Sequence, residues 1–124
     1  MSNIATTISQ SRKLIELGLD PKTADMVWVR YAAGGYRLEV LHRELFERIM
    51  ETDIAAWSLT ALLEVMRQIN AVTTLQVTSL STFMRCKDMG FIWQKDLHIN
   101  DPVTAAYEMV CYLLEQGLIK KGGE

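Results

Sequence analysis

The two cysteines and two histidines of this 124-residue chain are the side chains best suited to nucleophilic catalysis or metal binding. They are Cys86, Cys111, His42 and His98, and they lie far apart in the sequence. None of the CxxC, HxxxH or HExxH spacings that bring metal ligands together is present. A catalytic thiolate needs a base beside it, and neither cysteine has a histidine nearby in sequence. The pattern therefore favours structural roles for both thiols.

Asp96, His98 and Asp101 form the nearest approach to a ligand cluster. Alternation along a strand would place Asp96 and His98 on one face, whereas Asp101 directly precedes Pro102 and is suited to capping a helix. The three side chains would then point to different places. The chain also lacks a GxSxG elbow, and its Gly34-Gly35 pair lacks the lysine and hydroxyl residue of a phosphate loop. We therefore predict a protein that is not an enzyme and has no metal or cofactor.

Aromatic and basic residues are interleaved on the predicted strands, and they are the candidate binding residues of the chain. Such side chains, gathered on one exposed sheet face, could contact a protein, form a dimer interface or stack on single-stranded bases. The same alternation allows half of the rings to point into the core instead. The candidates for this face are Trp28, Arg30, Tyr36, Arg37, Trp93 and Lys95.

Composition limits the possible classes of protein. With 49% hydrophobic residues, the chain can build the core of one domain spanning residues 1–124, with a frayed tail at about 120–124. Its 13 basic and 15 acidic residues give a net charge of −2 and alternate along the chain, which weighs against nucleic acid as a partner. No apolar run reaches the roughly 18 residues that span a bilayer, and no signal peptide is recognisable. We expect a cytoplasmic protein with free thiols and no membrane contact.

The C-terminal region predicts a complete helix. Asp101 is a suitable N-cap, Pro102 fits the first helical position, and Gly117 can end the helix in the left-handed conformation. Leu118 is expected to fold back on the apolar stripe. The stripe is formed by residues spaced three or four apart, namely Ala106, Met109, Val110, Leu113 and Leu114.

Two further helices are predicted. One covers residues 58–69 with Ser58 as its cap, and the preceding Trp57 is expected to pin the helix entrance to the core rather than stack on a ligand. The other is a short N-terminal helix capped by Ser9 or Ser11 and ending near Gly18.

The strands are predicted from alternation and β-branched residues. Residues 26–40 read as a hairpin around Gly34-Gly35, although a helix over residues 38–51 competes for its end. Residues 72–83 predict one or two strands, residues 86–90 a turn and residues 91–93 another strand. The expected fold is α+β, with a small antiparallel sheet of about four or five strands packed against two or three helices.

Three phrases of the chain, at residues 9–19, 56–64 and 101–118, resemble a family of small uncharacterised proteins from prophages and conjugative elements of gut anaerobic bacteria. The resemblance implies a shared fold and carries no activity or functional residue with it. Our leading hypothesis is a non-enzymatic accessory or interaction protein of a mobile genetic element, with a protein partner or a homodimer. The alternative is a single-stranded nucleic-acid-binding module that uses the same aromatic and basic face.

Overall fold

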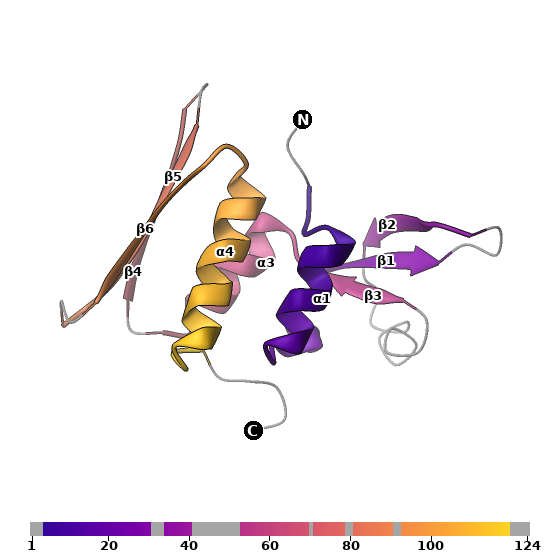
Figure 1. Ribbon diagram of the computed structural model, residues 1–124, viewed down its shortest axis with the longest axis horizontal. Coiled ribbons are helices and arrows are strands. Elements are labelled where there is room, and N and C mark those ends of the chain that lie inside the picture. The colour runs from indigo at the N-terminus through magenta and orange to yellow at the C-terminus, as the bar shows by residue number, and fades with distance from the viewer. Residues whose placement is uncertain are drawn as a thin grey trace.

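The computed structural model describes residues 4–30, 34–40, 53–69, 71–78, 81–90 and 93–119. Within them the fold is α+β, as predicted (Figure 1). The prediction of a single sheet was wrong, because the strands form two three-stranded antiparallel sheets, ordered β2-β1-β3 and β4-β5-β6. In chain order the elements are α1 (Ile8–Glu16), η1 (Pro21–Thr23), β1 (Met26–Arg30), β2 (Tyr36–Val40), β3 (Ile54–Ala56), α3 (Leu59–Met66), β4 (Ala71–Val77), β5 (Thr82–Asp88), β6 (Gln94–Ile99) and α4 (Pro102–Glu115).

The first sheet contains the predicted hairpin. β1 pairs with β2 in a register that places Trp28 opposite Leu38, and Gly34 and Gly35 both have φ of +91° in the connection. Positive φ at both glycines is the conformation that side-chain-bearing residues avoid. Because Leu38 belongs to β2, the competing helix cannot begin there. Its remaining residues, 41–51, lie outside the described part of the chain.

The second sheet consists of two successive hairpins, β4-β5 and β5-β6. The predicted turn at residues 86–90 was placed too early, because Cys86 is fully buried and lies within β5. The turn itself contains Met89 and Gly90, and β6 begins at Gln94, one residue after Trp93. Residues 91–92 of the predicted strand lie outside the described residues.

The helices begin at side-chain caps. Asp101 accepts from the N–H of Thr104 at the start of α4, and Ser58 accepts from the N–H of Ala61 at the start of α3, as predicted. The N-cap of α1 is Thr7 instead of Ser9 or Ser11, because Thr7 and Gln10 form a reciprocal capping box.

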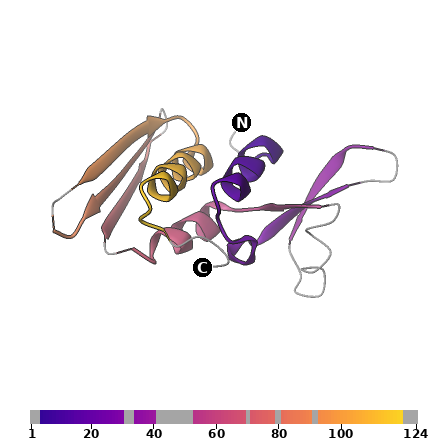
Figure 2. The same cartoon turned by 60° about the horizontal axis from the view of Figure 1, so that its bottom comes forward.

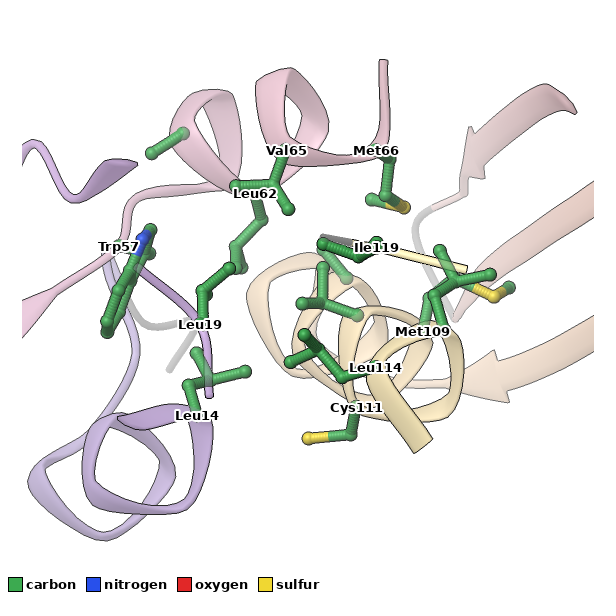
Figure 3. Packing of buried hydrophobic residues seen from close by; sticks show 14 of the residues in the cluster. Leu14, Leu19, Trp57, Leu62, Val65, Met66, Met109, Cys111, Leu114 and Ile119 are labelled. Carbon is green, nitrogen blue, oxygen red and sulfur yellow. The ribbon is translucent and has the colours of Figure 1, made fainter. Parts of the chain in front are cut away.

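One hydrophobic core connects the two sheets. Figures 1 and 2 show α3 and α4 beside the β4-β5-β6 sheet and α1 nearer to β2-β1-β3, and side chains from all three helices meet in Figure 3. The predicted stripe of α4 is buried throughout, and Trp57 is 0% exposed, which confirms its core role. Leu118 does not complete this packing, because it is 36% exposed while the neighbouring Ile119 is 2% exposed. The left-handed Gly117, at φ +72°, aims Ile119 and not Leu118 at the core.

A buried polar cluster around Thr6 joins the N-terminal segment to α1, β1 and β3. The Thr6 hydroxyl accepts from the backbone N–H of Trp57 at 3.1 Å and shares a 2.8 Å hydrogen bond with the hydroxyl of Ser11. The Thr6 carbonyl accepts from the indole N–H of Trp28 at 3.0 Å. Because Thr6 and Ser11 are both 0% exposed, water cannot replace these partners in the folded state.

Candidate functional site

The first sheet separates the four candidate residues that it contains. Trp28 and Arg30 lie on one face with Tyr36, which pairs with Arg30 across the hairpin. Arg37 pairs with Val29 and therefore lies on the opposite face, where it forms a 2.8 Å ion pair with Glu39. The indole N–H of Trp28 is already occupied, because it donates to the carbonyl of Thr6.

The other two candidates lie beside α4, with Lys95 in β6 of the second sheet and Trp93 directly before that strand. The rings of Trp93 and Tyr112 have centroids 6.2 Å apart, and the Lys95 ammonium lies 5.2 Å from the centre of the same Tyr112 ring. Trp93 is packed against the core cluster. The six candidate residues therefore do not form the single exposed face considered from the sequence, because they are divided between two sheets and point in different directions.

The structure presents a different surface on the second sheet. The inner face of β5 carries Thr82, Met84 and Cys86, all buried, and α4 packs against β5 and β6 on that side. Figure 2 shows that no described helix covers the opposite side. We call this side the outer face. By strand register it consists of Val72, Thr74, Gln76, Phe83, Arg85, Lys87, Gln94, Asp96 and His98.

The centre of the outer face is an ordered cross-strand cluster. The rings of Phe83 and His98, directly paired across β5 and β6, lie with centroids 4.8 Å apart. The guanidinium of Arg85 lies 5.2 Å from the centre of the Phe83 ring and donates to both carboxylate oxygens of Asp96, at 2.9 and 3.1 Å. Gln94 donates to the same carboxylate at 3.1 Å. These contacts hold the side chains in place before any partner arrives, which reduces the entropy lost on binding.

The electrostatics of the cluster follow from the Arg85 and Asp96 pair. The hydrogen bond from Arg85 lowers the pKa of Asp96 below its ordinary value, and the same bond raises the pKa of Arg85. Both groups therefore remain charged throughout the neutral range. The pair is self-neutralising, so Arg85 and Asp96 together add no net charge to the outer face.

The thiols are poorly suited to nucleophilic chemistry. Both cysteines are free and buried. Burial raises the pKa of Cys111 to about 11 and also raises that of Cys86, against the smaller opposing effect of its hydrogen bond with Thr73. At neutral pH both side chains are therefore almost entirely in the unreactive thiol form.

Among the residues described, none of the Cys, His, Asp and Glu side chains gather in groups of three or more that could hold a metal ion. Asp96 and His98 share a face, as predicted, and Asp101 caps α4. Within the same residues, no helix has the length and apolar character needed to cross a bilayer.

An open hollow of about 490 Å³ lies between η1 and α3. Its wall includes the Glu64 and Arg67 ion pair, whose two side chains are 62% and 76% exposed. The other lining residues are Thr23, Ala61, Val65 and Gln68. The two charged groups of the hollow are paired with each other and exposed to solvent. They would therefore contribute little binding energy or specificity to a ligand.

Sequence reasoning missed Phe83 and Arg85 as surface residues, although a usable signal was present. Residues 82–88 alternate, so assigning Met84 and Cys86 to the core would have placed Phe83, Arg85 and Lys87 together on the other side. No family model, curated protein or solved structure matches this chain.

Proposed function

We propose that this chain is a non-enzymatic interaction protein, an accessory of a mobile genetic element, that binds a protein partner on the outer face of the β4-β5-β6 sheet. The observation that carries the proposal is the prearranged cluster of Phe83, Arg85, Asp96 and His98 on a sheet face that no described element covers. The link to mobile elements rests on the resemblance noted in the sequence. The two unpaired thiols support a reducing, cytoplasmic setting.

The composition of the outer face suits a protein contact. Aromatic and arginine side chains supply most of the binding energy at protein interfaces, and Phe83 and Arg85 stand side by side at its centre. Exposed Val72, Thr74 and Gln76 provide an uncharged margin along β4. A partner segment with an apolar centre and polar rim would complement this arrangement.

Single-stranded nucleic acid is the alternative partner, favoured by the presence of two basic side chains and two rings on one face. Two contacts oppose it. Arg85 and His98 both lie against the Phe83 ring, which leaves little of it for a base to stack on, and Arg85 is already neutralised by Asp96.

The test compares Phe83→Ala with Tyr36→Ala, a matched loss of a strand aromatic from the other sheet. Each tagged protein is used to capture proteins from a lysate of the source organism, and the captured protein is then purified and titrated against all three forms. If Phe83 is an interface hot spot, its removal weakens binding about 30-fold or more, whereas Tyr36→Ala binds like the wild type. Circular dichroism verifies that both variants fold.

Equal binding by Phe83→Ala and the wild type would overturn the assignment of the outer face. Fluorescence anisotropy with a labelled 20-nucleotide strand tests the alternative directly. An affinity for that strand that falls steeply with added salt and is lost in Phe83→Ala would replace the protein partner with nucleic acid.

A further inference from the structure

The free edge of β4 differs from every other sheet edge that the structure describes. The four edge strands are β2 and β3 in the first sheet and β4 and β6 in the second. β2 carries Arg37 and Glu39, β6 carries Lys95 and Asp96, and β3 is three residues long. Charge and shortness both discourage edge-to-edge pairing. β4 has neither protection, because its seven residues, Ala71–Val77, include no charged side chain and no proline.

The hydrogen-bond pattern identifies the residues that face this edge. The N–H of Thr78 donates to the carbonyl of Ser81 at 2.9 Å, which makes these two residues a hydrogen-bonded pair at the end of the hairpin. Since such pairs alternate along an antiparallel ladder, the backbone N–H and C=O groups of Thr73, Leu75 and Val77 point away from β5. No strand among the described residues pairs with β4 on that side.

We infer that β4 pairs with β4 of a second copy of this chain, in an antiparallel arrangement about a two-fold axis at Thr74. This register uses the whole strand, because Thr74 is its midpoint. Thr73 then exchanges hydrogen bonds with Leu75 of the second copy, and Ala71 does the same with Val77. Residues of the same face meet in every pair, so the outer faces of the two copies become continuous.

The side chains favour a copy of the same chain as the occupant. Thr74 meets its own counterpart at a non-hydrogen-bonded position, where threonine pairs approach closely and can bond through their hydroxyls. Val72 and Val77, 52% and 58% exposed in one copy, are covered by Gln76 and Ala71 of the other. Like charges, the usual obstacle to self-pairing, do not occur at any position of the strand.

This inference rests on the proposed function, action through protein contacts, and names a second copy of the chain as one partner. The dimer would form one six-stranded sheet that presents two copies of the Phe83 and Arg85 cluster. Its test requires only purified protein, so it can fail while partner binding on the outer face is upheld, and the reverse also holds.

The test places a charged side chain at the two-fold axis. Thr74→Lys and Thr74→Glu each bring two like charges together at the axis, and each is expected to raise the dimer dissociation constant about tenfold or more. Light scattering after size exclusion, at a concentration between the two dissociation constants, should then show a mass nearer to 14.1 kDa for each variant alone and nearer to twice that mass for the wild type. An equimolar mixture of the two variants should recover the dimer, because Lys then faces Glu.

Thr60→Lys provides the matched control, because Thr60 is an exposed threonine in the first turn of α3 and is not part of the β4 strand. It should remain dimeric, and circular dichroism should show all variants folded. A wild type that is monomeric up to about 1 mM overturns the inference, because its self-association would then be weaker than about 4 kcal/mol. Dimers of Thr74→Lys alone, or a mixture that stays monomeric, overturn the Thr74 register.

Discussion

Replacing Thr6 with valine should destabilise the fold by about 2–6 kcal/mol, although threonine and valine have nearly the same shape. The substitution removes the acceptor of the Trp57 N–H and the hydrogen-bond partner of the Ser11 hydroxyl. Each group is left unpaired in a buried site, at a cost of about 1–3 kcal/mol. Thr6→Ser, which keeps the hydroxyl and loses one methyl group, should cost only about 1 kcal/mol.

Urea unfolding followed by circular dichroism measures these costs. An unchanged slope of the unfolding free energy against urea concentration would show that the substitution does not alter the unfolded state. The reasoning also predicts coupling with Ser11→Ala. In the Thr6→Val background the serine hydroxyl has already lost its partner, so its removal should cost about 1 kcal/mol less than in the wild type. A Thr6→Val cost below about 1 kcal/mol, or equal Ser11→Ala costs in both backgrounds, would refute the energetic role assigned to this cluster.

Asp101→Ala should cost about 1 kcal/mol by removing the N-cap of α4, measured by thermal unfolding. Gly117→Ala should cost about the same, solely through its φ of +72°, because an added Cβ meets nothing within 4 Å; a smaller loss in Gly117→Asn would verify the backbone origin. Since burial raises the pKa of Cys111 from 9.0 to about 11, the thiol contributes stability that is fully present below pH 9 and is lost as pH rises towards 11. Urea midpoints across this range should fall more in the wild type than in Cys111→Ala. Arg85→Gln should raise the pKa of Asp96 towards its ordinary value, which carbon-detected NMR titration of the carboxyl group would record.

Local signals in the sequence were sufficient to predict that the helices exist and where α3 and α4 begin. Asp101, Pro102 and Gly117 define α4 through capping interactions within a few residues, and Ser58 does the same for α3. The cap of α1 was misplaced because Ser9 and Ser11 have the same capping chemistry as Thr7. Only the reciprocal bond with Gln10 distinguishes them.

The division of the strands into two sheets could not be predicted because it depends on long-range pairing. β1 pairs with β3, which lies beyond residues 41–53 in the chain, and no local pattern specifies that partner. Alternation also shows which residues share a face without showing which face is buried. Trp93 therefore looked like a possible surface residue until its contact with Tyr112 placed it beside α4.

The central position of α4 has a consequence for biosynthesis. This helix packs against α3, α1, β5 and β6, yet it is made after all of them. Its contacts with α1 and α3 join segments that are distant in sequence, and such contacts form slowly. A nascent chain that has not yet released α4 from the ribosome exposes the inner face of β5 and the apolar side of α3. During that interval these apolar surfaces, together with the uncharged edge of β4, are open to chaperones. Chaperone binding should therefore be strongest on chains truncated just before Asp101.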